Sequence, residues 1–429
     1  MRIRNAVLTS LLSSVGLLAA SGLISVEAVQ AKPLVTGVQA GDQTLSPFYE
    51  WSGALPQKPG VMLRTEPMPS QPEFTAAGKM LRMLYTSTDA RWNSGVIPVS
   101  GILYLPKGEP PKGGWPIVAW GHGTVGVADI CAPSWTKLAP RDATYLNRWL
   151  EQGFAVVATD YQGLGGPGPH PYQFWEAEGR SILDSVRAAL ASYPTLLEDK
   201  VVITGQSQGA GSALGASRIA PTYAPELRIM TTIATGVLTA FPDGPHKLKD
   251  AVPTEKWSAR FTMQRIIGGA LPDNGPKAED LVTPEGAALL KLGRESCSVE
   301  LRDYEQANKL NQGKVFTMAP AALEAMLIPA KNMDMVKLSS PLFIGTGLAD
   351  KTVVPERQYA AAVALCAAGN ALTWKTYPGL GHGGVVNEAF DDELKFVRLA
   401  FEHKTAPSNC NDLKEPGAPH DATPGIPFN

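Results

Sequence analysis

The chain has 429 residues, of which 44% are hydrophobic, and its formal net charge is −2. This composition is typical of a globular protein and excludes an intrinsically disordered chain. The near-neutral charge provides no basic surface of the kind that binds nucleic acid, so no nucleic-acid partner is expected.

Residues 1–31 have the features of a secretory signal peptide. Two basic residues, Arg2 and Arg4, precede an apolar stretch at 7–24, and Val29-Gln30-Ala31 suits a cleavage site after Ala31. We therefore expect a secreted or periplasmic protein, with an uncleaved membrane anchor as the alternative. No later stretch of about 18 apolar residues indicates a stable membrane span.

Residues 32–78 are rich in proline and polar residues and are predicted to form an extended N-terminal arm. Short apolar runs then alternate with segments of helical spacing. Strands are expected at 80–86, 96–105, 116–120, 154–158, 201–204 and 227–234, and helices at 138–152, 176–192 and 210–220. This alternation predicts an α/β fold, with a mostly parallel central sheet flanked by helices.

About a hundred residues, 236–338, interrupt the alternation and are too long for a loop. We expect them to fold as a mainly helical cap or lid, although a purely structural excursion is the alternative. Further strands at 341–345 and 371–376 and helices at 355–368 and 388–403 would complete the core, which then comprises residues 79–235 and 339–404. The tail, 405–429, contains five prolines and is predicted to be irregular.

The motif Gly205-Gln206-Ser207-Gln208-Gly209 directly follows a predicted buried strand and precedes a predicted helix. Strand, G-x-S-x-G and helix together are the context of a nucleophile elbow, in which a strained turn exposes the serine hydroxyl. The pentapeptide alone also arises by chance, and a glycine-rich turn with an ordinary serine is the alternative. We expect Ser207 to be a catalytic nucleophile.

A serine nucleophile needs a base and an orienting acid, which follow it in the order acid, then histidine, in this arrangement. Of six histidines, His382 alone lies in a glycine-rich loop directly after the last predicted strand. Asp350 follows the preceding strand and is the expected acid. Asp160 is the second candidate, although we interpret it as a structural loop residue near the site.

The oxyanion that forms on the substrate needs backbone N–H donors. We expect one from Gln208, the residue after the nucleophile, and one from Thr124 in the loop after the third strand, with Gly123 as the alternative. His122 precedes this loop and is expected to orient or pack rather than to act as a base.

Four cysteines, Cys131, Cys297, Cys366 and Cys410, are an even number in a chain predicted to be exported, which favours two disulfides. Three pairings are possible, and four buried free thiols are the alternative. The chain has no C-x-x-C pair and no H-E-x-x-H motif, so neither a zinc site nor another metal or organic cofactor is expected.

Together these residues resemble the secretory lipase family, the lipase A-like branch of the α/β-hydrolases. The resemblance spans about residues 75 to 412 and rests on motifs that include Gly121-His-Gly-Thr124, Cys131-Ala-Pro-Ser134, Thr159-Asp-Tyr-Gln-Gly-Leu-Gly165, the elbow, Ala349-Asp350 and Gly381-His382. It implies hydrolysis of carboxylic esters, a cap inserted at 236–338, and disulfides that pair Cys131 with Cys297 and Cys366 with Cys410.

We therefore expect a secreted serine ester hydrolase, a lipase or carboxylesterase, that acts on a small-molecule or lipid ester through an acyl-enzyme on Ser207. Because a catalytic triad does not choose the leaving group, a serine peptidase or amidase on the same fold is one alternative. A catalytically inactive binding protein is the other.

Overall fold

The computed structural model describes residue 43, residues 45–246 and residues 258–429. The predicted signal peptide, residues 1–31, and its cleavage site lie outside these residues. Within the described part of the chain, no helix is both long enough and apolar enough to cross a membrane.

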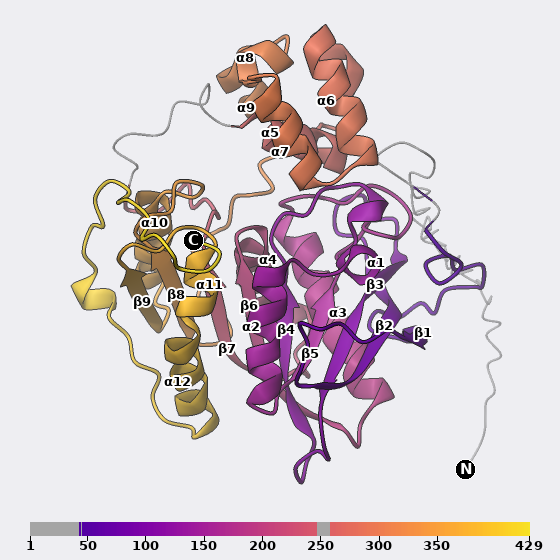
Figure 1. The fold of residues 1–429 in the computed structure, drawn as a ribbon, viewed down its shortest axis with the longest axis vertical. Coiled ribbons are helices and arrows are strands. Elements are labelled where there is room, and N and C mark those ends of the chain that lie inside the picture. The colour runs from indigo at the N-terminus through magenta and orange to yellow at the C-terminus, as the bar shows by residue number, and fades with distance from the viewer. Residues whose placement is uncertain (1–42, 44, 247–257) are drawn as a thin grey trace, which may run out of the picture. The chain divides into compact units, whose positions relative to one another are not determined.

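A nine-stranded sheet, in the order β1-β2-β3-β5-β4-β6-β7-β8-β9, forms the centre of the fold (Figure 1). The first three strand pairs are antiparallel and the remaining five are parallel, so the predicted mostly parallel sheet is confirmed. The strands are β1 Met62–Pro67, β2 Ala77–Thr88, β3 Val96–Pro106, β4 Trp115–Gly121, β5 Ala155–Thr159, β6 Leu197–Gln206, β7 Ile229–Thr235, β8 Leu342–Gly347 and β9 Leu372–Tyr377.

Helices cover both faces of this sheet, which explains why its central strands are apolar without alternation. Because successive side chains of a strand point to opposite faces, Ile117 and Ala119 of β4 pack with one set of helices, and Val118 and Trp120 with the other. The first set contains α3 Trp175–Ser192 and α4 Gln208–Tyr223, and the second contains α2 Pro140–Glu151 and α12 Phe390–Phe401. The remaining core helices are α1 Pro133–Thr136, α10 Pro355–Ala367 and α11 Gly384–Glu388.

The segment between β7 and β8 folds into helices that share an apolar core of their own (Figure 1). These helices are α5 Ala259–Arg265, α6 Pro284–Glu295, α7 Ser298–Ala307, α8 Gln312–Val315 and α9 Pro320–Met326. Met263, Leu289 and Leu301 are fully buried in this core. Val127 and Tyr172, from loops that follow β4 and β5, join the same cluster and so connect these helices to the sheet.

At the chain ends, the structure corrects the predicted boundary of the arm and adds contacts to the predicted irregular tail. The arm predicted at 32–78 contributes the edge strand β1, and β2 begins at Ala77 inside the predicted arm. β1 was missed because prolines surround it, yet Pro67 is acceptable there, since an edge strand needs no N–H on its outer side. The tail has no helix or strand beyond the 3-10 turn Cys410–Asp412. However, it returns to the sheet, where His420 N donates to Leu348 O at 2.7 Å and Thr423 N donates to Gly379 O at 2.8 Å.

Candidate active site

Ser207 lies between the last residue of β6 and the first residue of α4. Its φ of 58° and ψ of −116° are strained for a residue with a side chain. Such a turn requires small neighbours: a Cβ on Gly209 would lie 1.8 Å from Gly121 O, and one on Gly205 would lie 2.0 Å from Gly209 O. The glycines of the motif therefore allow strand, turn and helix to pass within backbone contact, as a nucleophile elbow needs.

The predicted acid and base are hydrogen-bonded to each other. His382 Nδ1 donates to Asp350 Oδ2 at 2.7 Å, and Asp350 is fully buried. Backbone amides of Thr352 and Val353 donate to Asp350 Oδ1, both at 2.8 Å, and Gln358 Nε2 donates to Oδ2 at 3.0 Å. This set of donors orients the carboxylate, and a proton on His382 Nδ1 leaves Nε2 as the accepting nitrogen.

A turn at the end of β7 brings this pair to the elbow. Ser207 N donates to Thr235 O at 2.9 Å. The next residue, Gly236, has a φ of 65°, and a Cβ there would lie 2.8 Å from His382 Cε1. In addition, Gln206 Nε2 donates to His382 O at 3.3 Å. Ser207 and the His382 imidazole therefore lie against the same turn.

The predicted oxyanion donors flank the serine. Gln208 is the first residue of α4, where backbone N–H groups have no partner within the helix. Thr124 lines the same cavity as Ser207, and its Oγ1 lies 2.8 Å from Tyr172 Oη. The Gly123 carbonyl accepts from His122 Nδ1 at 2.7 Å, which holds this loop. The roles of Gln208, Thr124 and the alternative Gly123 as donors stay predictions.

The second candidate acid has different partners. Asp160 is fully buried, and its carboxylate accepts from Ser100 Oγ at 2.6 Å and from Ser134 N at 2.9 Å. Burial raises the pKa of Asp160, although these donors oppose the shift. His122 Nε2 contacts only the backbone oxygen of Asp160, at 3.2 Å. These contacts support a structural role for Asp160 and an orienting or packing role for His122, and both roles stay predictions.

Sequence reasoning missed a buried polar network behind Gln208. Its Nε2 donates to Glu178 Oε1 at 2.8 Å and to His170 Nε2 at 2.9 Å. Burial raises the pKa of Glu178 to about 8 and lowers that of His170 to about 3. A charged residue four positions before Ile182 on the apolar face of α3 was the available signal for Glu178. Nothing in the sequence marked Gln358.

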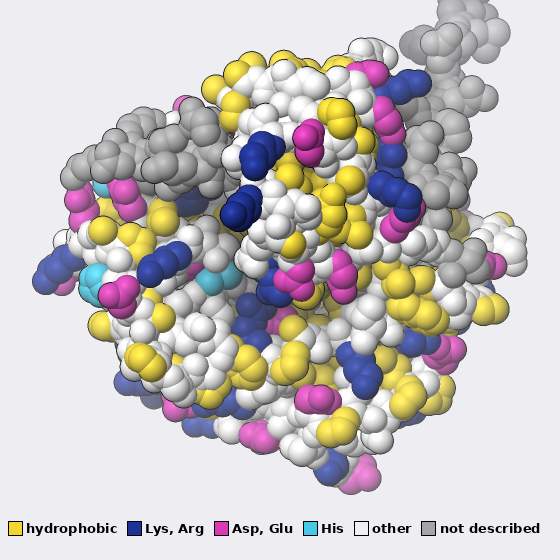
Figure 2. Space-filling model, turned by 45° about the horizontal axis from the view of Figure 1, so that its top comes forward, with side chains coloured by type: hydrophobic (Ala, Val, Ile, Leu, Met, Phe, Trp, Pro, Cys, Tyr) yellow, Lys and Arg dark blue, Asp and Glu magenta, His cyan; other side chains and the backbone are white. Residues whose placement is uncertain are grey.

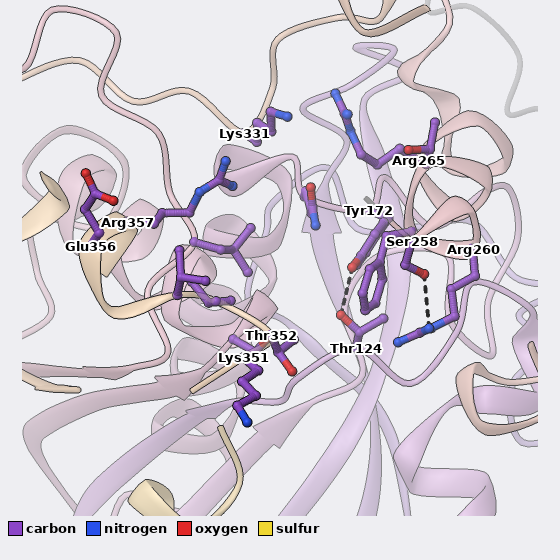
Figure 3. A pocket seen from close by; sticks show the side chains of 17 residues that line it. Thr124, Tyr172, Ser258, Arg260, Arg265, Lys331, Lys351, Thr352, Glu356 and Arg357 are labelled. Carbon is purple, nitrogen blue, oxygen red and sulfur yellow. Dashed lines mark hydrogen bonds between the residues drawn. The ribbon is translucent and has the colours of Figure 1, made fainter. Parts of the chain in front are cut away.

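Ser207 lines a cavity of about 370 Å³. Figure 3 shows this cavity from close by, with its lining side chains as sticks. The core contributes the loops after β4, β5, β7 and β8, and α5 contributes side chains from the segment between β7 and β8. Its lining includes Thr124, Leu238, Arg265, Lys331, Val353 and Arg357.

Two disulfides connect the loops of this region to neighbouring segments. Cys131, in the segment between β4 and α1, forms a disulfide with Cys297, which directly precedes α7. Cys366 of α10 is bonded to Cys410 in the tail. These are the pairings that the family resemblance implies. Within the described residues, no group of three or more histidine, cysteine or acidic side chains is arranged to hold a metal ion.

The fold, with its strand, sharp turn and helix around Ser207, defines the α/β-hydrolase class. Residues 131–382, more than half of the chain, match the secretory lipase family, and the chain belongs to this family. It is 26% identical over 395 residues to lipase A of Moesziomyces aphidis, covering 86% of this chain and 80% of that one. It is 25% identical over 334 residues to lipase 6 of Candida albicans, covering 71% and 70%.

Solved structures support the fold. Candida antarctica lipase A in its closed state has a TM-score of 0.61 at 20% identity, covering 92% of this chain and 91% of that one. The rice cell wall degrading esterase LipA of Xanthomonas oryzae has a TM-score of 0.56 at 18% identity, covering 80% and 97%. The family relatives indicate that this protein is a lipase or esterase that hydrolyses carboxylic esters.

Proposed function

We propose that the protein hydrolyses carboxylic esters through an acyl-enzyme on Ser207, with His382 as base and Asp350 as orienting acid. One observation carries the proposal: the strained serine and the imidazole lie against the same turn at Thr235 and Gly236, and the imidazole is bonded to a buried aspartate. A base held in this way can take the proton of a serine hydroxyl.

The reaction would proceed in two halves. His382 Nε2 removes the Ser207 proton while Oγ bonds to the ester carbonyl carbon, and the resulting oxyanion accepts from the N–H groups of Gln208 and Thr124. The imidazolium then protonates the departing alcohol, which leaves the acyl group on Ser207. Water, deprotonated by His382, attacks this acyl-enzyme, and release of the acid restores the serine.

The surroundings of the site support an exported enzyme with a covered entrance. The chain belongs to a family of secretory lipases and contains two disulfides, which persist in oxidising compartments. We propose that residues 1–31 direct export and are removed after Ala31. The helical segment within 236–338 lines the cavity and would act as the cap that selects small-molecule or lipid esters.

Two measurements separate this function from its alternatives. A fluorophosphonate probe should label Ser207, and p-nitrophenyl butyrate should be cleaved far faster than the corresponding p-nitroanilide. Ser207→Ala should abolish both labelling and hydrolysis. Ser217→Ala is the matched control, because Ser217 lies on the same helix and its Oγ contacts Ser339 outside the site.

Each contrary outcome has a distinct meaning. Faster cleavage of the anilide would indicate a peptidase or amidase. A folded protein that neither reacts with the probe nor cleaves either substrate would be an inactive binding protein.

Activity should also fall toward acidic pH, because a protonated imidazole cannot act as a base.

A further inference from the structure

The cavity above Ser207 is lined by more positive charge than an uncharged ester requires. Among the described residues, five cationic side chains line it, Arg260, Arg265, Lys331, Lys351 and Arg357, against one carboxylate, that of Glu356 (Figure 3). Figure 2 shows Lys and Arg side chains in the hollow at the centre of the face that it presents. A pocket for an acyl chain is normally lined by apolar groups with few polar ones.

Three of these cations gather around one glutamate. Arg265 Nη1 lies 2.6 Å from Glu324 Oε2, and Lys331 Nζ is paired with Glu324 Oε1. Burial lowers the pKa of Lys331 to about 8. The positive charges of Arg265 and Arg357 also lower this pKa, and Arg265 has the larger effect. Burial also lowers the pKa of Arg357, against the attraction of Glu324. The three cations are therefore close enough to repel one another in a partly desolvated place.

Arg265 has a buried donor that remains to be satisfied. The residue is only 5% exposed, and its Nη2 has no hydrogen-bond partner among the described residues. Arg260 is different, since its guanidinium binds both Ser258 Oγ and Glu305 Oε2. Leaving a buried guanidinium N–H without an acceptor is costly, so an anion that reaches Arg265 from the cavity would gain a charge-assisted hydrogen bond.

The same cavity also has an apolar part. Leu238, Phe261, Val353 and Val354 line it together with Ser207. A ligand that fits both parts has an ester carbonyl for Ser207, a short apolar spacer, and an anionic group at a distance from the carbonyl. Planar guanidinium groups suit carboxylate and phosphate oxygens.

We propose that the preferred substrates are esters that carry a second, anionic group, a carboxylate or phosphate, which binds to Arg265, Lys331 and Arg357. This inference rests on the proposed function, since it assigns the substrate class of the Ser207 site. The anion could belong to the acyl part or to the alcohol part of the ester, because both parts must fit above the serine.

The test compares charged esters with uncharged esters of the same shape. In the acyl arm, p-nitrophenyl monoesters of glutaric, adipic and suberic acid are compared with their terminal carboxamides, which are isosteric and neutral. In the alcohol arm, the butyrate ester of 4-hydroxybenzoate is compared with that of 4-hydroxybenzamide. In at least one arm kcat/KM should favour the anion by about 10- to 100-fold at low salt, the range that a hydrogen bond to a charged group supplies. This preference should shrink as salt screens the charges.

Substitutions locate the effect. Arg265→Gln should bring the ratio of anionic to neutral kcat/KM close to one, and Arg265→Lys should retain part of it. Arg302→Gln is the control, because this exposed arginine of α7 pairs with Asp303 and does not line the cavity. The ratio of the unmodified enzyme needs no variant, so it remains informative even if Arg265→Gln does not fold.

A unit ratio in both arms, or a ratio that survives Arg265→Gln in folded protein, would overturn this proposal. If neither the charged nor the neutral esters are cleaved and the fluorophosphonate does not label Ser207, the proposed function itself has failed. Preference in the acyl arm would assign the anion to the acid, and preference in the alcohol arm would assign it to the alcohol.

Discussion

Asp160 and Asp350 occupy comparable places but have different partners. Each lies in the loop after a strand of the central sheet, β5 for Asp160 and β8 for Asp350, and each is fully buried. Asp160 accepts hydrogen bonds from Ser100 and Ser134, so it ties β3 to the loop that contains α1. Asp350 accepts from two backbone amides, from Gln358 and from His382.

This difference shows that burial alone does not make an aspartate part of a catalytic apparatus. An orienting acid needs a base as a partner and further donors that hold its carboxylate in place. Asp350 has both, whereas the donors to Asp160 are hydroxyl and amide groups that take no part in the proposed reaction. We therefore expect substitution of Asp350 to lower activity more than stability, and substitution of Asp160 to lower stability more than activity.

The largest effect should come from exchanging each carboxylate for an amide. Asp350→Asn should lower kcat on p-nitrophenyl butyrate by roughly 10³- to 10⁴-fold, because the amide cannot hold the imidazole in the required tautomer. Asp160→Asn should lower kcat by less than about tenfold but should lower Tm, since a buried hydrogen-bond network is disturbed. The opposite pattern, with near-normal activity in Asp350→Asn, would make Asp160 the acid.

Removing one donor to Asp350 should have a smaller effect. Gln358 Nε2 also donates to Val353 O at 2.7 Å, so Gln358→Ala should loosen the carboxylate and its loop together. We expect kcat to fall by about 10- to 100-fold, as for a small misplacement of a catalytic group, with little change in KM. Ser100→Ala, which removes a donor to Asp160, is the matched control and should leave kcat within a fewfold. Equal losses in the two variants would contradict the distinction between the two aspartates.

Removing one disulfide at a time destabilises the surroundings of Asp160 and those of Asp350 separately. Cys131–Cys297 lies near Ser134 on the Asp160 side and joins the helical segment, whereas Cys366–Cys410 lies beside β9 on the Asp350 side. For separations of 166 and 44 residues, the chain-entropy model gives about 5 and about 4 kcal/mol. In each variant, both cysteines of one disulfide are replaced by serine, and we expect a lower Tm in both variants. The variant that lacks Cys131–Cys297 should lose more activity. A larger loss of activity in the Cys366/Cys410 variant would refute this order.

Two buried glutamates should give the smallest effects, visible as pH dependence. Burial raises the pKa of both Glu178 and Glu393 from 4.5 to about 8. Because a raised pKa means that the folded state favours the protonated carboxyl, each group adds to the free energy of unfolding. This contribution is complete below pH 4.5 and is lost as the pH rises to about 8. The Tm of each variant, Glu178→Gln or Glu393→Gln, should be compared with the Tm of wild type at the same pH. Between pH 5 and pH 8 this difference should shift in favour of the variant by on the order of 5 °C.

Only Glu178→Gln should also change kcat, because Glu178 contacts the side chain of Gln208, whereas Glu393 accepts from Tyr145 Oη at 2.7 Å, away from the site. A Tm difference that does not vary with pH would show that these carboxyls are ionised in the folded protein.

The sequence was sufficient to predict the sheet apart from β1 and to select Ser207, Asp350 and His382 as candidates, because both depend on local signals. Unbroken apolar runs mark strands covered on both faces, and glycines around Ser207 and His382 mark close backbone passages. The edge strand β1 was not predictable in this way, since its exposed side has no apolar alternation and prolines lie nearby.

The partners of the site residues depend on packing between distant segments, which no local pattern encodes. Gln358 reaches Asp350 because α10 begins directly behind the β8 loop. Glu178 meets Gln208 because α3 lies against α4, and His170 reaches it from the loop that precedes α3. Similarly, the return of the tail to Leu348 and Gly379 could not be inferred from a proline-rich sequence.

Trapping the acyl-enzyme tests whether Ser207 is the nucleophile. Enzyme mixed with p-nitrophenyl butyrate should be quenched in acid during turnover, digested, and mapped by mass spectrometry. We predict a butyryl group on the peptide that contains Ser207, and none in Ser207→Ala, with Ser217→Ala behaving as wild type. An acyl group on another residue, or turnover by Ser207→Ala at a rate near that of wild type, would contradict the account.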